Sequence, residues 1–260
     1  MRRIYLNRNE CLIESGKIII RGETYHYLKN VLRAKESYSF SVFDGSGKEY
    51  IVEISKIRKN FLEAVILKKM EKYDVETSFD LYLFQSIPKS KKIEEIIEGT
   101  VQLGIKGIYP VISKRTVVNM PEDKVKNKMK RWKKISEEAS KVSGRTVIPN
   151  IFSIIKFEEA VKISKDIGLI FWEGGKKILR DVIGENINFS PMNKRIHIFV
   201  GPEGGFDEEE IILAKNNNFF ISSLGKRILK VEIASIVATA LTIYEIEQLS
   251  HKFNSSSRKR

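Results

Sequence analysis

From residue 79 onward, apolar strand-like segments alternate with segments of helical periodicity, and no other feature of the sequence restricts the fold as much. Leu81–Phe84 is typical of a strand, and the apolar residues within 93–101 recur at the i, i+3, i+4 spacing of a helix. Further strands are expected at 107–112, 167–172, 196–200 and 219–224, with a long basic helix at 122–142. Strands that alternate with helices in this way predict an α/β fold with a mostly parallel sheet.

The first 72 residues have a different pattern, in which short strands surround one helix. Tyr38–Phe43 and Glu49–Ile54 predict a hairpin across the glycine-containing turn 44–47, and 61–67 predicts a further strand. A short helix is expected at 24–33, with Thr24 as its cap. We therefore expect a small β-barrel at 1–72, a linker within 68–78, an α/β domain at 77–248 and a disordered basic tail at 249–260.

The chain is strongly basic, with 46 Lys and Arg against 33 Asp and Glu and a formal net charge of +13. Between Lys124 and Lys134, seven of eleven residues are Lys or Arg and none is acidic. Such a run is typical either of a solvated helix face or of a surface that binds nucleic-acid phosphates. Charge alone leaves both interpretations open.

Several classes of protein are disfavoured by what the sequence lacks. No segment approaches the roughly 18 consecutive apolar residues of a membrane span, and the first residues lack the apolar core of a signal peptide. The single cysteine, Cys11, allows no internal disulfide, which fits a cytoplasmic location. The histidines have no metal-ligand spacing, so no metal site is expected. The motifs of serine hydrolases, of dinucleotide-binding proteins and of phosphate loops are absent as well.

Two loops that follow apolar strands and precede helices are the candidate ligand sites, because ligands of parallel sheets gather at the carboxyl ends of the strands. In Gly201-Pro-Glu-Gly-Gly205, three glycines allow a ligand to approach the backbone. In Leu224-Gly-Lys-Arg-Ile-Leu229, the Ile228–Leu229 pair is suited to cover a planar apolar group such as adenine. For each loop, an ordinary connection between a strand and a helix is the alternative.

The segment 233–244, which follows the second loop, is apolar or small on nearly every face. A helix of this composition should be buried on all sides, either at the centre of its domain or at a subunit interface. Ala234 and Ala238 are small enough to let a second helix approach closely. We expect this helix to form the contact of a homodimer.

Taken together, these features resemble the RsmE family of 16S ribosomal RNA (uracil-N3)-methyltransferases, within the SPOUT superfamily. The resemblance spans nearly the whole chain, and its most specific parts are the loops at 201–205 and 224–229, in that order and followed by the apolar helix. The remaining matches, in chain order, are His26 with Val31-Leu32-Arg33, Pro88-Lys89, Glu95–Gly104, Pro110–Ser113 with Arg115, Arg131-Trp132 with Ile135, Glu138-Ala139, Gly144-Arg145 and Pro149.

The resemblance implies an amino-terminal PUA-like barrel that binds RNA, and a carboxyl-terminal α/β domain with a trefoil knot that binds S-adenosylmethionine (SAM). It points to 16S ribosomal RNA or the small ribosomal subunit as partner, and to a homodimer. The residues that it assigns to the cofactor are Gly201, Pro202, Leu224, Gly225, Ile228 and Leu229, with Trp172 and Glu173 from an earlier loop.

The implied reaction is methyl transfer to N3 of a uridine. The methyl group of SAM is already activated, so the main task of such an enzyme is to align the acceptor. The proton on N3 must leave, which a base or a nearby cation would help. On this interpretation the candidate catalytic residues are Arg145, Arg227 and Glu232. The candidate RNA contacts are His26, Arg33, Arg115, Lys130, Arg131 and Lys134.

The chain also departs from the family's pattern. It has Lys230-Val-Glu-Ile233 where the family commonly has Arg-Thr-Glu-Thr, and Val142 where the family commonly has Gln. The two absent hydroxyls would change a cap, a cofactor contact or a uracil contact, whereas Glu232 is kept. Two other functions stay open: a non-catalytic RNA-binding protein, and a SPOUT methyltransferase that modifies a different nucleotide.

Overall fold

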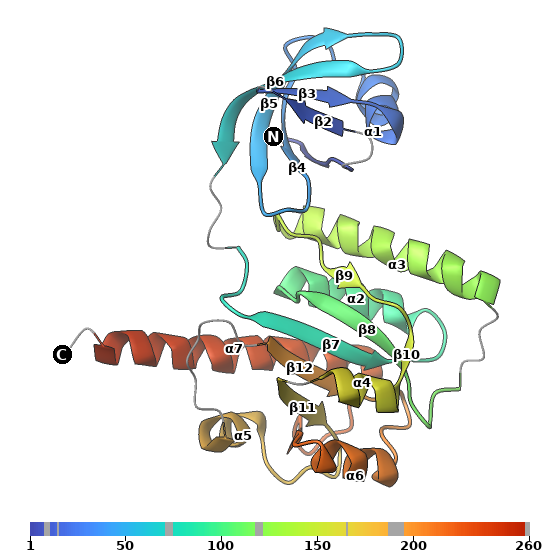
Figure 1. Cartoon of the computed structure of the whole chain (residues 1–260), viewed down its shortest axis with the longest axis vertical. Helices are drawn as coiled ribbons and strands as arrows, with labels where there is room; N and C mark the ends of the chain where they lie inside the picture. The colour runs from blue at the N-terminus through green and yellow to red at the C-terminus, as the bar shows by residue number, and fades with distance from the viewer. Residues whose placement is uncertain are drawn as a thin grey trace. The chain divides into compact units, whose positions relative to one another are not determined.

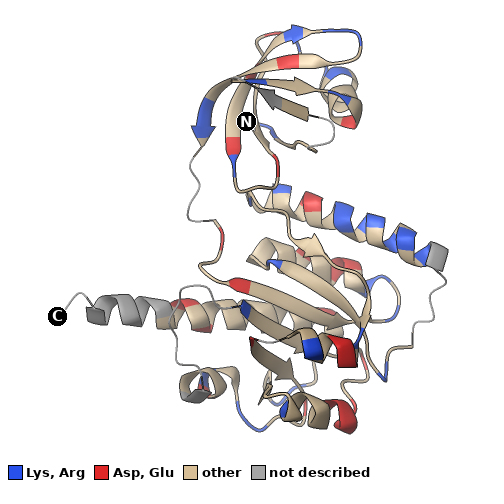
Figure 2. Ribbon diagram, in the orientation of Figure 1, with Lys and Arg blue, Asp and Glu red and all other residues tan. Residues whose placement is uncertain are grey.

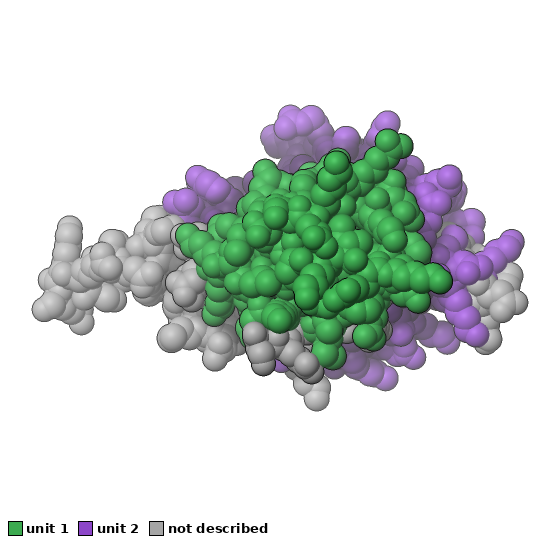
Figure 3. Space-filling view, turned by 90° about the horizontal axis from the view of Figure 1, so that it is seen from above, with its two compact units in different colours: residues 1–76, 140–148 green, residues 77–139, 149–260 purple. Residues whose placement is uncertain are grey.

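The computed structural model describes residues 1–7, 11–14, 16–70, 75–117, 122–164, 166–186 and 195–257. The chain divides into two compact units, which Figure 3 colours separately. Unit 1 consists of residues 1–76 and 140–148, and unit 2 of residues 77–139 and 149–260. Part of the predicted linker, 71–74, lies outside the described residues.

Unit 1 is built on a six-stranded sheet with the order β1-β4-β5-β6-β3-β2. Neighbouring strands are antiparallel, except that β1 is parallel to β4. The predicted hairpin is confirmed, because β4 and β5 pair from Ser39 opposite Glu53 to Phe43 opposite Glu49. The strands are β1 (Arg3–Tyr5), β2 (Cys11–Glu14), β3 (Lys17–Ile20), β4 (Ser39–Phe43), β5 (Glu49–Ile57) and β6 (Leu62–Met70).

The helix of unit 1 differs from the predicted one in its start and in its form. Helix α1 (Gly22–His26) begins after Arg21 and continues as a π-helix, η1 (Tyr27–Val31). Thr24 therefore lies inside the helix and is not its cap, because the helix already begins at Gly22. Leu28 and Tyr25 pack into the core of the sheet.

Segment 140–148 belongs to unit 1 although it is far from the rest of that unit in sequence. Arg3 in β1 donates to the carbonyl oxygens of Ser140, Lys141 and Arg145 at 3.1, 3.3 and 2.5 Å. The carboxylate of Glu76 accepts from the Arg145 side chain. These polar contacts fix segment 140–148 against the rest of unit 1.

Unit 2 contains an all-parallel sheet with the order β10-β8-β7-β12-β11-β13, and β9 pairs with β8 (Figure 1). The predicted α/β class is confirmed. The strands are β7 (Asp80–Ser86), β8 (Gly107–Ile112), β9 (Asn150–Ile151), β10 (Ile155–Lys156), β11 (Ile167–Phe171), β12 (Arg195–Val200) and β13 (Phe220–Ser222). The helices are α2 (Lys92–Leu103), α3 (Glu122–Val142), α4 (Phe157–Ile163), α5 (Leu179–Asn186), α6 (Glu208–Asn216) and α7 (Val231–Ser257).

The central strands are buried on both faces of this sheet, as expected for a parallel sheet covered by helices. Along β7, Leu81 and Leu83 contribute to one core, which also contains residues of α2, α3, α5 and α7. Phe84 contributes to a second core, which contains residues of α4 and α6. Period-two alternation along the strands thus divides the interior into two layers.

Helix α7 continues to Ser257, so the predicted disordered tail at 249–260 is helical over most of its length. The last three residues of the predicted tail, 258–260, lie outside the described part of the chain. Among the described residues, no helix is long and apolar enough to cross a membrane.

Candidate functional site

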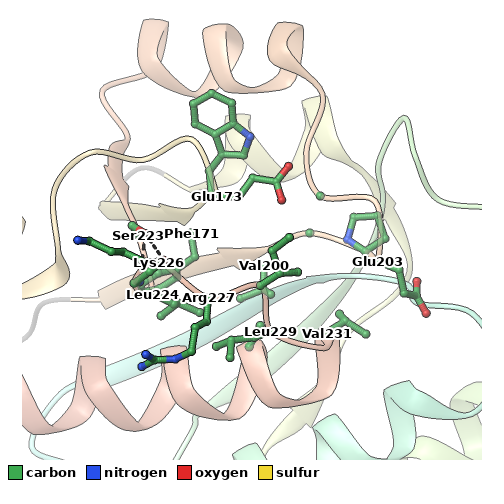
Figure 4. Close-up of a pocket in the computed structure, with 17 residues that line it drawn as sticks. Phe171, Glu173, Val200, Glu203, Ser223, Leu224, Lys226, Arg227, Leu229 and Val231 are labelled. Carbon is green, nitrogen blue, oxygen red and sulfur yellow. Dashed lines mark hydrogen bonds between the residues drawn. The ribbon is translucent and has the colours of Figure 1, made fainter.

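A cavity of unit 2 lies where three neighbouring parallel strands end. Phe171 ends β11, Val200 ends β12 and Ser223 follows β13, and all three line the cavity (Figure 4). Its volume is about 350 Å³, within the range of small-molecule sites. Position and size make it the candidate ligand site of the domain.

The loop after β12 passes so close to itself that a side chain at its start would press on its own backbone. A Cβ added to Gly201 would lie 3.0 Å from the carbonyl carbon of Gly205. Gly205 has a φ of +67°, a backbone conformation that favours glycine. A capping box follows the loop, since Asp207 and Glu210 bind each other's backbone N–H groups at the start of α6. The glycines therefore set the path of the loop that forms one wall.

A second close approach joins the loop after β11 to β13. A Cβ on Gly175 would lie 2.9 Å from the carbonyl group of Ser222, and one on Gly174 would overlap the indole of Trp172. Trp172 and Glu173 line the cavity from this loop. Their backbone is fixed by the hydrogen bond from Trp172 N to Ser222 O, 3.0 Å long.

The loop after β13 and the first turn of α7 form the rest of the wall. Leu224 and Leu229 are partly buried, whereas Ile228 is 92% exposed. Of the predicted Ile228–Leu229 pair, the leucine is thus sheltered and the isoleucine lies at the rim. Val231, the residue that stands in place of a commonly found threonine, is buried and lines the cavity.

A charged cluster stands beside the cavity, where α2 and α7 begin. Lys92 Nζ lies 2.9 Å from Glu203 Oε1 and 4.0 Å from Glu232 Oε2. Burial alone would raise the pKa of Glu203, but hydrogen bonds from Lys92 and from the backbone N–H of Lys89 hold that pKa below its usual value. The hydrogen bond to Glu203 raises the pKa of Lys92. Both groups are therefore charged near neutral pH.

The structure brings together most of the residues that the sequence assigned to a cofactor and a reaction. All eight assigned cofactor residues and Arg227 line one cavity. Glu232 is next to it in the first turn of α7, and its Oε2 atom is buried without a hydrogen-bond partner. The eight are Trp172, Glu173, Gly201, Pro202, Leu224, Gly225, Ile228 and Leu229.

Arg145, the remaining predicted catalytic residue, belongs to the other unit. It is 1% exposed, lies in unit 1 and binds Glu76 through Nε and Nη2 at 3.0 and 2.6 Å. Its guanidinium is thus engaged within the fold.

The predicted RNA contacts are spread over the surfaces of both units. His26 and Arg33 are exposed in unit 1, and Lys130, Arg131 and Lys134 are exposed on α3. Figure 2 shows that Lys and Arg positions recur along α3. Arg131 pairs with Glu94 at 2.7 Å, so part of its charge is neutralised. Arg115 donates to Gly204 O at 2.7 Å and to Asp207 Oδ2 at 3.3 Å, which ties it to the glycine loop.

Three polar residues near the cavity were missed by the sequence analysis. Gln85 directly follows the expected strand Leu81–Phe84, and Lys92 directly precedes the first apolar residue of the expected helix. Glu203 lies within the glycine loop and was given no role of its own. Only Glu203 carried a local signal, as a charged residue among glycines. Among the described residues, no group of three His, Cys, Asp or Glu side chains is arranged to hold a metal ion.

The chain matches two family models in tandem. The RNA methyltransferase PUA domain matches residues 20–67, and the RNA methyltransferase domain matches residues 75–243. Ribosomal RNA small subunit methyltransferase E of Rickettsia conorii is 33% identical over 92% of this chain and 93% of its own length. The protein of the same name from Bacillus subtilis is 26% identical over 96% of this chain and 98% of its own length.

Solved structures agree with these matches. Ribosomal RNA small subunit methyltransferase E from Neisseria gonorrhoeae, bound to S-adenosyl methionine, is 31% identical and superposes with a TM-score of 0.79 over 93% of this chain and 96% of its own. A Legionella pneumophila protein with bound cofactor SAM is 27% identical, also with a TM-score of 0.79, over 92% and 95% of the two chains.

Proposed function

The chain belongs to the RNA methyltransferase family of ribosomal RNA small subunit methyltransferase E, and from that premise we propose that it methylates N3 of a uridine in 16S ribosomal RNA, with SAM as the methyl donor. The observation that carries the proposal is the cavity at the ends of β11, β12 and β13, which every residue assigned to the cofactor lines. It lies where the trefoil knot of the SPOUT superfamily is expected.

The residues of the cavity fit SAM in size and chemistry. The volume of about 350 Å³ suits a ligand of nucleoside size, and Val200, Leu224 and Leu229 offer apolar surface to an adenine ring. Gly201 lines the cavity and lets the loop close tightly against Gly205, which also lines it. Glu173 and Glu203 add negative charge to the lining, which suits a cofactor with a sulfonium and an ammonium group.

SAM supplies an activated methyl group, so the chain's own residues have to hold the uracil in line and accept its N3 proton. We propose that Arg227, which lines the cavity, favours the anionic form of the uracil. We propose Glu232 as the proton acceptor, because its Oε2 atom has no hydrogen-bond partner. Arg145 fits a different role, because its pairing with Glu76 supports the fold of unit 1 and leaves no free guanidinium for the substrate.

RNA would be held on two surfaces, one on each unit. On unit 1 we propose contacts from His26 and Arg33, and on unit 2 from Arg115, Lys130 and Lys134. Arg131 would contribute less, because it is paired with Glu94. Exposed cations of this kind bind phosphates and make RNA binding strongly dependent on salt concentration.

We assign residues 1–72 to RNA binding and 77–248 to methyl transfer. We also propose that the enzyme acts in the cytoplasm.

We also propose a homodimer that forms through α7, but not through the face expected from the sequence. Ala238 is fully buried in its own domain, because α2 and α5 pack against that side of α7. The apolar residues left exposed lie on another side: Ile233 is 45%, Leu241 40% and Tyr244 53% exposed. With the half-exposed Val237 they follow a helical i, i+4, i+8, i+11 spacing, which forms one continuous stripe.

The decisive experiment is nucleoside mass spectrometry of 16S ribosomal RNA that has been incubated with the purified protein and SAM. We expect one additional 3-methyluridine for each RNA molecule. Methylation at another atom or base would instead support a SPOUT enzyme of different specificity. RNA binding without any methylated product, and without SAM binding in calorimetry, would identify a non-catalytic RNA-binding protein.

A further inference from the structure

Gln85 is a fully buried polar residue in the last pair of residues that joins β7 to β12. It is next to last in β7 and lies opposite Val200, the last residue of β12. A buried primary amide is costly unless its donors and acceptor are all used. Its hydrogen bonds therefore indicate what holds it there.

The amide nitrogen of Gln85 binds backbone oxygens at the edge of the cavity. Nε2 donates to Ser86 O at 2.9 Å, and to Val200 O and Gly201 O at 3.4 Å each. Rotating the amide by 180° would point its oxygen at three carbonyl oxygens, so only one orientation is possible. Gln85 thereby fixes the end of β12 and the first residue of the glycine loop.

The amide oxygen of Gln85 binds the first turns of α7. Ser235 Oγ lies 2.5 Å from Gln85 Oε1 and 2.8 Å from Val231 O. Ser235 is fully buried, and its neighbours Val231 and Ala234 line the cavity. One side chain therefore joins the glycine loop to the helix that forms another part of the wall.

We propose that Gln85 is the positioning residue of the SAM site. It does not line the cavity, but the two parts of the wall that it joins, at Val200–Gly201 and Val231–Ala234, both do. A ligand binds more tightly to walls that are already in place, since no free energy is then spent on ordering them. The inference rests on the proposed function, because it assumes that SAM occupies this cavity.

The test compares Gln85→Met with a matched variant, Thr242→Val. Methionine keeps the length of glutamine but forms none of its hydrogen bonds. Thr242 is equally buried and polar and lies on α7, but it bonds only Ala238 O and does not line the cavity. Calorimetry with SAM and with S-adenosylhomocysteine measures binding without RNA, and thermal unfolding measures the stability of each variant.

We expect Gln85→Met to raise the Kd for both ligands about tenfold or more, and Thr242→Val to leave both values within about twofold even when its Tm falls. Ser235→Ala should raise the Kd by a smaller factor. The double variant should be weaker than wild type by less than the product of the two single effects, because the two residues share one hydrogen bond.

The outcomes separate this inference from the function on which it rests. A wild-type protein that binds neither ligand would overturn the proposed function itself. A wild type that binds, together with folded Gln85→Met and Ser235→Ala variants of unchanged Kd, would overturn only the role of Gln85. Should Gln85→Met not fold, Ser235→Ala decides alone, and an unchanged Kd for that variant overturns the inference.

Discussion

The carboxylate of Glu76 binds the guanidinium of Arg145 through two donors at 2.6 and 3.0 Å, and it also accepts the backbone N–H groups of Thr146 and Val147. We predict that Arg145→Ala destabilises the protein by about 2–4 kcal/mol, because it leaves this carboxylate without its cation. Denaturant unfolding measures the loss. The Kd for SAM should be unchanged in the fraction that remains folded. A variant of normal stability that binds RNA but does not methylate it would instead place Arg145 at the reacting uracil.

Gly201→Ala should weaken SAM binding, because the new Cβ would meet the backbone of Gly205 at 3.0 Å and displace the loop. The expected loss is at least tenfold in Kd by calorimetry, with no metal added. The matched control is Gly184→Ala in α5, where nothing lies within 4 Å of the added atom. Equal affinities of both variants and the wild type would show that SAM does not contact this loop.

Reversing Lys130, Lys133 and Lys134 to Glu should weaken RNA binding and reduce its dependence on salt. Each lost phosphate contact should reduce the slope of log K against log salt by roughly one unit on duplex RNA, and by less on single strands. Filter binding over a range of salt concentrations gives the slopes. The same reversal of Lys156, Lys162 and Lys215, which are exposed elsewhere on unit 2, controls for total charge. Identical slopes for the two triple variants would argue against a specific role for α3.

Leu241→Glu should convert the protein to monomers and abolish methyl transfer, because it places a charge in the middle of the exposed apolar stripe of α7. Light scattering gives the oligomeric state. Ile212→Glu is the control, since Ile212 is 56% exposed on α6, away from the stripe. A wild type that is monomeric and fully active at the assay concentration would refute the dimer.

The stability of the protein should fall as the solution is acidified from pH 6.5 to pH 4, owing to His197. Burial lowers the pKa of this histidine from 6.5 to about 4. The unfolded chain therefore binds a proton in this range that the folded chain does not, and stability decreases with falling pH by at most about 3 kcal/mol. Urea unfolding at several pH values gives the profile. His197→Gln should flatten that part of it, whereas His26→Gln on the exposed helix should not.

The walls of the cavity were predictable because the signals for them are local. The glycines of 201–205 and the apolar pair of 224–229 lie within a few residues of each other, next to the strands that carry them. Gln85 was not predictable, because its partners at Val200 and Ser235 are 115 and 150 residues away and meet it only through the order of the strands.

The surroundings of Arg145 and of Ala238 depend on contacts between residues far apart in the sequence, which short-range patterns do not reveal. Arg145 is held by Glu76, 69 residues earlier in the chain, so its neighbours in the sequence do not reveal the ion pair. Ala238 is small and lies on an apolar helix, but the positions of α2, α5 and the strands β7 and β12 decide which side of that helix faces inward.

The return of segment 140–148 to unit 1 has a consequence for the order in which the chain folds during synthesis. Arg3 and Glu76 leave the ribosome long before the segment that they bind, so unit 1 is incomplete until residue 148 has been made. By then the residues of β7, α2 and β8 have already been synthesised. Domains are generally expected to fold in turn from the amino terminus, but here the first unit has to wait for part of the second. For the same reason, a fragment cut at residue 76 would contain all six strands of the sheet but would lack the groups that Arg3 and Glu76 bind.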